Sequence, residues 1–194
     1  GDVQWMTSGS GIIHSEGPSE AFAQEGGEME LIQLWVNLPR DHKLTAPKYQ
    51  DIKGATMPVI EEGGFSWKVV AGEYGGTKGP ATTFSPLLAL MGSFKAGAEI
   101  TISLADSYNV LVYILEGTIE AGNEIFDRLN LAVFKKDGEG IHLKAKSDGR
   151  LLFLAGEPLQ EPMVSYGPFV MNYPGELKQA VMDYEMGKMG ALEG

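Results

Sequence analysis

Apolar and polar residues alternate with a period of two along much of the chain, in short stretches bounded by glycine and proline. This pattern is typical of antiparallel strands in a barrel or sandwich. In the second half, the stretches with strand composition are Phe65–Ala71, Leu87–Phe94, Glu99–Leu104, Val110–Leu115, Leu131–Phe134, Ile141–Ala145 and Arg150–Leu154. The sequence therefore predicts an all-β fold whose second half forms a complete barrel.

The first half contains fewer strand signals. Leu31–Leu38 has the composition of a buried strand, and the stretch Ser8–Gly11 is a glycine-rich turn. Residues 15–30 read as a loop with five glutamates and no lysine or arginine. This acidic run indicates a solvated loop rather than a substrate-binding segment. Residues 39–58 are polar and contain four prolines or glycines, which predicts a linker.

One helix is predicted, near the end of the chain. Asn172 can cap it, Pro174 suits the first turn, and Glu176 favours the positive end of the helix dipole. Gly187 would end the helix. Its apolar stripe, which predicts packing on the rest of the protein, consists of Leu177, Ala180, Val181 and Tyr184.

Composition and charge exclude several classes of function. The 194 residues are 43% hydrophobic, enough for a sizeable core. The net charge of −11 argues against direct binding to nucleic acid. With no cysteine, disulfides and thiolate metal sites are absent, so a redox response must involve a metal or methionine. No apolar run approaches the roughly 20 residues of a membrane span, and a cytoplasmic location is the default, with the nucleus also open.

His14 and Glu16 are the main candidates for chemistry. They lie two residues apart just after the glycine turn, and residues i and i+2 of a strand point to the same face. An imidazole and a carboxylate that converge in this way can supply half of a metal site. Iron(II) enzymes that activate oxygen commonly use two or three histidines and one carboxylate, with open positions for substrate and O2.

Three blocks of sequence resemble the pirin family of bicupins. They are GDVQWMTSGSGIIHSE at the start, LIQLWVNLP followed by PKYQ, and the late GEP…YGPFVMN. The resemblance implies two cupin (double-stranded β-helix) barrels, the first incomplete in this chain, and a C-terminal helix. It divides the chain into 1–58 (the end of the N-terminal barrel plus linker), 59–170 (the C-terminal barrel) and 171–194 (helix and tail).

The resemblance also implies a metal centre on the first barrel. In pirins, a His-x-His pair, a further histidine and a glutamate hold one divalent ion, most often Fe(II). The last two ligands correspond to His14 and Glu16, whereas the His-x-His pair belongs upstream of Gly1. The chain is therefore expected to be an N-terminally truncated pirin, whose metal site is incomplete without the upstream histidines.

The second barrel is expected to bind no metal. The segment FKAGAEITISLADSYNVLVYILEGTIEAGN is similar to a cupin core, but Tyr108, Asn109 and Tyr113 stand where the family often has a histidine pair. His142 lies on the polar side of an alternating strand, so a solvent-facing or hydrogen-bonded histidine is favoured over a ligand. His42, in a polar context, is expected to be exposed.

Bacterial pirins are associated with quercetin 2,3-dioxygenase activity, in which a flavonol ring is cleaved with loss of carbon monoxide. The resemblance implies that activity here, with Glu16 both as ligand and as acceptor of the substrate hydroxyl proton. Trp5 and Met6 could line a site for a flat aromatic substrate, although core packing is favoured for Trp5. Two other hypotheses stay open: an iron-dependent transcriptional co-regulator that binds a protein partner, as eukaryotic pirins do, and a truncated chain with neither activity. A monomer is expected.

Overall fold

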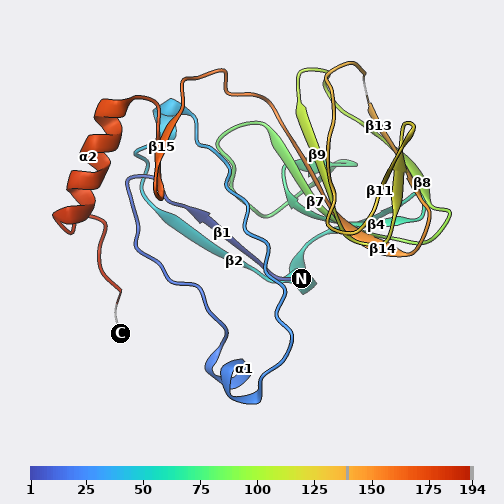
Figure 1. Cartoon of the computed structure of the whole chain (residues 1–194), viewed down its shortest axis with the longest axis horizontal. Coiled ribbons are helices and arrows are strands. Elements are labelled where there is room, and N and C mark those ends of the chain that lie inside the picture. The colour runs from blue at the N-terminus through green and yellow to red at the C-terminus, as the bar shows by residue number, and fades with distance from the viewer. Residues whose placement is uncertain (139, 193–194) are drawn as a thin grey trace. The chain divides into compact units, whose positions relative to one another are not determined.

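The computed structural model describes residues 1–138 and 140–192 (Figure 1). The chain divides into two compact units. The first comprises Gly1–Trp5 and Tyr49–Gln160, and the second comprises Met6–Lys48 and Glu161–Gly194. None of the helices in the described part of the chain is long and apolar enough to cross a membrane.

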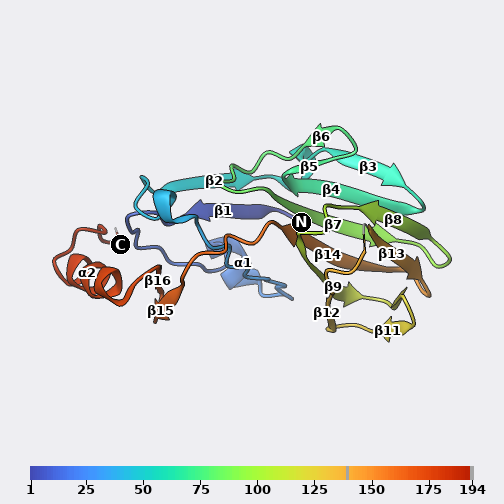
Figure 2. The ribbon, with the colours of Figure 1, turned by 90° about the horizontal axis from the view of Figure 1, so that it is seen from above.

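The first unit contains two large antiparallel sheets (Figure 2). The six-stranded sheet has the order β12-β9-β14-β7-β4-β3 and is built from β3 (Val59–Glu62), β4 (Phe65–Ala71), β7 (Leu87–Phe94), β9 (Asn109–Glu116), β12 (Leu131–Val133) and β14 (Gly149–Gly156). The four-stranded sheet has the order β11-β10-β13-β8 and is built from β8 (Glu99–Ser103), β10 (Ile119–Ala121), β11 (Glu124–Phe126) and β13 (Gly140–Ala145).

One apolar core lies between these two sheets, and it explains why their strands form. Buried and exposed residues alternate along β8, β9 and β14, so each strand contributes one face to the same core. Aromatic rings occupy the centre: Trp67 is fully buried, with its ring centroid 5.2 Å from that of Phe65 and 6.2 Å from that of Phe153. Gly92 leaves room for this indole, because a Cβ there would lie 2.5 Å from the Trp67 ring. The inside of the barrel is therefore filled by side chains.

All seven predicted strands of the second half are present, and their ends agree within two residues. The all-β prediction is confirmed. The sequence pattern missed several short elements, among them β3, β10, β11 and the two-residue strands β5 (Glu73–Tyr74) and β6 (Thr77–Lys78). Elements of two to four residues are too short to show a clear period.

A second apolar cluster in the first unit includes Trp5. This residue is half-buried, and its indole N–H donates to the carbonyl of Thr82 at 2.9 Å. Trp5 thus packs against this apolar cluster, as the sequence favours. Trp5 lies on β1 (Val3–Thr7), which pairs with β2 (Lys48–Ile52). The segment predicted as a linker, residues 39–58, thus contains a strand, together with the 3-10 turns Arg40–His42 and Gly54–Thr56.

The second unit holds the two α-helices of the described chain and a small hairpin. Helix α1 (Glu20–Glu25) lies inside the predicted acidic loop and begins where the Ser19 hydroxyl accepts a hydrogen bond from Phe22 N–H. The hairpin pairs β15 (Val164–Tyr166) with β16 (Phe169–Met171), and helix α2 (Pro174–Glu185) packs against it.

The prediction of a buried strand at Leu31–Leu38 is wrong. These residues have no strand pairing in the structure, and Leu31 and Trp35 are 64% and 62% exposed. A strand is stable only when a neighbour satisfies its backbone and covers its apolar face. No described strand pairs with this segment, so its apolar composition is not matched by burial.

The predicted C-terminal helix is confirmed, but its start differs. The N-cap is Tyr173 rather than Asn172, and the Glu176 carboxylate reaches back to accept the backbone N–H groups of both residues. The helix ends at Glu185, followed by Gly187 at φ 72°. Its stripe is half-buried at Leu177, Ala180 and Val181, and the Tyr184 ring packs edge-on against Phe169.

Asn172 instead belongs to a buried polar cluster. Its side chain is 1% exposed and donates to the carbonyl of Pro162 at 2.8 Å and to the carboxylate of Glu161 at 3.3 Å. Lys43 is also buried, and desolvation lowers its pKa, while the charges of Glu161 and Glu176 act in the opposite direction. The cluster links the turn at Lys43 to the start of α2. It gives Asn172, the last residue of the YGPFVMN block, a structural role.

Replacing Asn172 by aspartate is expected to destabilise the fold by about 1–3 kcal/mol. The substitution keeps the shape but turns the donor into an acceptor between two other acceptors, the Pro162 carbonyl and the Glu161 carboxylate. Urea unfolding at neutral pH measures the change. Asn123→Asp is the matched control because Asn123 is exposed, and an equal loss in both variants would contradict the role of the cluster.

Candidate metal centre

His14 and Glu16 lie in an irregular segment of the second unit, after the glycine turn. The segment is not a strand, yet the two side chains converge, with 3.5 Å between His14 Nδ1 and Glu16 Oε1. Their side chains are 41% and 34% exposed. The convergence predicted from the spacing is present, although it arises from an irregular backbone. The assignment of both residues as metal ligands stays a prediction.

The Glu16 carboxylate has a second partner. Gln33 Nε2 donates to Glu16 Oε2 at 3.2 Å, while Oε1 is the oxygen nearer His14. Gln33 comes from the exposed apolar segment Leu31–Leu38, where it is the first polar side chain among hydrophobic ones. Sequence reasoning did not assign it a role. Its position as a polar residue within an apolar run was the available signal.

The glycine turn is fixed against a neighbouring loop. Ser10 N–H donates to the carbonyl of Thr45 at 2.9 Å, and Gly11 N–H donates to the carbonyl of Ser8 at 2.9 Å. Gly9 has φ 51°, and a Cβ there would lie 2.1 Å from the Thr45 carbonyl oxygen. Only glycine permits this approach without moving the backbone. These contacts therefore fix the position of the backbone just before His14.

The two side chains fit half of a site for a divalent ion. Donor atoms that bind one ion at about 2.1 Å stand roughly 3 to 3.5 Å apart, as His14 Nδ1 and Glu16 Oε1 do. No group of three or more histidine, aspartate or glutamate side chains suited to a metal is found among residues 1–138 and 140–192. The described chain thus offers two converging donors, and an ion bound there needs further ligands.

Negative charge surrounds this pair along the sequence. Glu20 and Glu25 bound α1, and Glu28 and Glu30 follow it, all with exposed side chains. No lysine or arginine lies between residues 15 and 30. Acidic surroundings of this kind favour a cation over an anion. The charge agrees with a metal site but does not select which metal.

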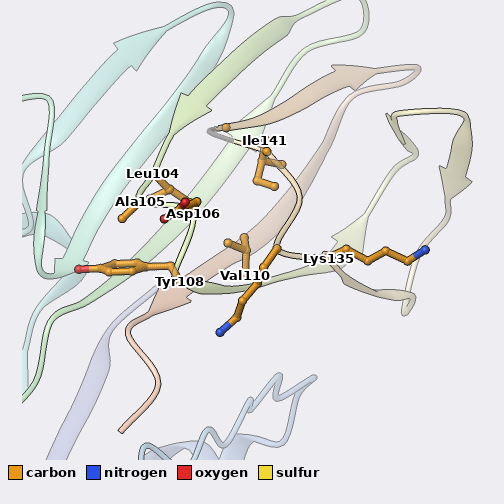
Figure 3. A pocket seen from close by; sticks show the side chains of 10 residues that line it. Leu104, Ala105, Asp106, Tyr108, Val110, Lys135 and Ile141 are labelled. Atoms are coloured by element: carbon orange, nitrogen blue, oxygen red, sulfur yellow. The ribbon is translucent and has the colours of Figure 1, made fainter. Parts of the chain in front are cut away.

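In the cupin barrel of the first unit, no three histidine, aspartate or glutamate side chains suited to a metal lie together among the described residues. The hollow beside Tyr108 has a volume of only about 10 Å³, close to the space needed for one water molecule. Figure 3 shows Tyr108 and Lys135 extending away from each other on either side of Val110. Ligand pockets for molecules of drug size are on the order of 300–1,000 Å³. A flavonol would not fit in this hollow.

The remaining histidines are placed as the sequence predicts. His142 projects from the outer side of β13, where Nε2 lies 3.0 Å from Glu99 Oε1 and Nδ1 lies 3.0 Å from the Thr101 hydroxyl. It is hydrogen-bonded and half-exposed, as expected for a residue on the polar face. His42 is exposed in the 3-10 turn Arg40–His42.

A larger hollow, with a volume of about 380 Å³, lies on the outer face of the six-stranded sheet. Two ion pairs lie at its lining: Lys95 lies 2.8 Å from Asp148, and Arg150 contacts Glu116. Pairing with these bases lowers the pKa values of Glu116 and Asp148. The hollow does not contain His14 or Glu16.

Two antiparallel sheets around one core define the first unit as a cupin barrel. Comparison with known proteins agrees with this class. The profile of the pirin C-terminal cupin domain matches residues 90–190, and the profile of pirin matches residues 1–36. A Pseudomonas aeruginosa protein named "Putative quercetin 2,3-dioxygenase" is 42% identical over 190 residues, which cover 97% of this chain and 66% of that protein. The chain belongs to the pirin family.

Two further relatives extend the comparison. Pirin-like protein 2 of Arabidopsis thaliana is 38% identical over 201 residues, covering 98% of this chain and 60% of that protein. A crystal structure of quercetin 2,3-dioxygenase from Acinetobacter baumannii matches 100% of this chain and 68% of that chain, with a TM-score of 0.93 and 41% identity. The chain thus spans about two thirds of the length of the relatives that it matches.

Proposed function

We propose that this chain carries two ligands, His14 and Glu16, of the metal centre of a quercetin 2,3-dioxygenase-type oxygenase. The supporting observation is the convergence of these two side chains at 3.5 Å, in a chain that is similar over its whole length to a quercetin 2,3-dioxygenase. The other ligands would come from the part of the relatives that lies outside the match, about a third of the Pseudomonas protein.

Each residue has a separate part in this proposal. His14 supplies a neutral nitrogen, and Glu16 supplies a negative oxygen that favours a divalent ion, Fe(II) in our proposal. When bound, the ion would act as a Lewis acid toward a flavonol hydroxyl and would open a redox route to dioxygen. Glu16 takes up the proton of the substrate hydroxyl on a carboxylate oxygen. Gln33 holds the other oxygen and so fixes the orientation of the carboxylate.

The same proposal accounts for the exposed apolar segment Leu31–Leu38. In a complete N-terminal cupin barrel this segment would pair with strands from the additional length of the relatives. Burial of its leucines and Trp35 would then supply the missing wall of the barrel and hold Gln33 beside Glu16. The boundaries 1–58, 59–170 and 171–194 are part of this proposal.

Oxygen uptake with quercetin tests the function. The natural polypeptide, including any residues that precede Gly1, should consume oxygen with quercetin after loading with Fe(II), and uptake should stop when a chelator removes the metal. The absence of turnover in iron-loaded protein would contradict the oxygenase.

A second function, binding of a basic protein partner as a metal-dependent co-regulator, is favoured by the net charge of −11. Under that alternative, the iron-loaded protein would show no turnover. Its affinity for a basic partner, such as a DNA-binding domain, would change with the oxidation state of the iron. The oxygen-uptake experiment therefore separates the two functions.

A further inference from the structure

The C-terminal tail contacts the segment that leads to His14. After α2, Gly187 at φ 72° turns the chain, and its N–H donates to the carbonyl of Tyr184 at 2.9 Å. Two residues later, the carbonyl of Met189 accepts a hydrogen bond from Ile13 N–H at 3.2 Å. Ile13 is the residue directly before His14. The tail is therefore attached one residue away from a candidate ligand.

The side chain of Met189 makes a second contact with this segment. A Cβ added at Gly11 would lie 2.4 to 2.8 Å from the Cγ, Sδ and Cε atoms of Met189. The methionine side chain thus lies directly against the Gly11 backbone, three residues before His14, and is itself half-buried. Gly11 has φ 117°, a conformation that side chains rarely adopt. The thioether fills the space that any other residue at position 11 would need.

The ligand segment is consequently held at two points. Thr45 accepts from Ser10 on the glycine turn, and Met189 accepts from Ile13 and covers Gly11. Contacts that orient metal ligands without touching the metal commonly change affinity by about 10- to 100-fold. Because the residues around His14 form no helix or strand, such external contacts decide where the imidazole points.

We propose that Met189 is a positioning residue for the His14–Glu16 pair, and that oxidation of its thioether to the sulfoxide releases the segment. The proposal rests on the proposed function, since it takes this pair to be metal ligands. In the oxidation, hydrogen peroxide transfers one oxygen atom to Sδ, the O–O bond breaks, sulfur loses two electrons and water leaves. The product is polar and larger, and it no longer fits against the Gly11 backbone.

With nine methionines and no cysteine, the thioethers are the side chains of this chain that peroxide oxidises most readily. Met186 serves as an internal comparison because it lies three residues earlier on the same tail and is 55% exposed. Exposure makes Met186 easier to oxidise, but its place at the end of α2 gives it no part in the contact with Gly11 described here. Comparing variants of the two methionines therefore distinguishes a general effect of oxidation from the release of the segment by oxidation of Met189.

Amide hydrogen exchange of Ile13, measured by NMR without metal, tests the contact directly. Met189→Gln, which places a polar group near the sulfoxide position, should speed Ile13 exchange about five- to tenfold. Peroxide treatment should do the same in the wild type and in Met186→Leu but not in Met189→Leu, which keeps apolar volume without the sulfur. Equal acceleration in peroxide-treated wild type and Met189→Leu would overturn the proposal.

A Co²⁺ titration followed by visible absorption tests the consequence for the metal. In the natural polypeptide, Met189→Gln should bind Co²⁺ about tenfold more weakly than the wild type. Met189→Leu should bind Co²⁺ with the affinity of the wild type. Wild-type affinity in Met189→Gln would overturn the positioning role. Failure of the wild type to bind Co²⁺ would instead contradict the proposed function, while the Ile13 exchange result would still decide whether the contact exists.

Discussion

Replacing His14 by alanine is expected to weaken metal binding by at least about a hundredfold, because a direct ligand contributes more than residues that only orient ligands, whose loss costs about 10- to 100-fold. The substitution removes the nitrogen that lies 3.5 Å from Glu16 Oε1, and a water molecule in its place binds a divalent ion more weakly than an imidazole does. Metal content of the purified natural polypeptide, measured by plasma mass spectrometry, gives the result. The variant should contain almost no iron under conditions in which the wild type is loaded.

His142→Ala is the matched control for this experiment. His142 is about as exposed as His14 and also lies beside a glutamate, at 3.0 Å from Glu99, but it belongs to the outer face of the second barrel. Loss of this histidine should leave the metal content unchanged. Full metal content in His14→Ala, or loss of metal in His142→Ala, would show that the site has been placed on the wrong part of the chain.

Glu16→Asp should keep much of the metal and lose most of the turnover. The change preserves the charge but withdraws the carboxylate by one methylene, about 1 Å, which moves it away from both His14 and Gln33. Misplacement of this size can cost roughly a hundredfold in rate when one group must both bind metal and accept a proton. Oxygen uptake with quercetin, at matched iron content, measures the effect.

Two outcomes of the Glu16→Asp experiment carry opposite meanings. A large fall in turnover with retained iron supports a role in proton transfer. Turnover equal to that of the wild type would remove the proton-acceptor role and leave Glu16 as a ligand only. Gln33→Glu offers a comparison, because it leaves the Glu16 side chain intact and replaces its hydrogen-bond donor by a second carboxylate.

The alternation of apolar and polar residues predicted the cupin barrel of the first unit well. Its strands are buried on one face, so each strand shows the alternation in its own sequence. β4 and β7, for example, were predicted with their observed ends. The same rule failed for Leu31–Leu38, which has strand composition but no partner among the described strands. The composition of a segment shows that its side chains can be buried. Whether they are buried depends on a neighbouring strand, which the sequence of the segment itself does not reveal.

The candidate site was predictable only in part. The spacing of His14 and Glu16 revealed the pair, even though the backbone around them proved irregular. The residues that hold the pair, Gln33, Thr45 and Met189, come from distant parts of the chain. Their contacts depend on the path of loops and of the tail, for which the sequence shows no periodicity. Of the three, only Gln33 carried a signal in the sequence, as a polar residue within an apolar run.

The most direct test of the central claim is an anomalous-difference map at the absorption edge of the bound metal, from crystals of the natural polypeptide loaded with Fe(II) or Co²⁺. The account predicts one strong peak about 2.1 Å from a ring nitrogen of His14 and from a carboxylate oxygen of Glu16. A peak beside His142, or a fully occupied peak that neither His14 nor Glu16 touches, would contradict it.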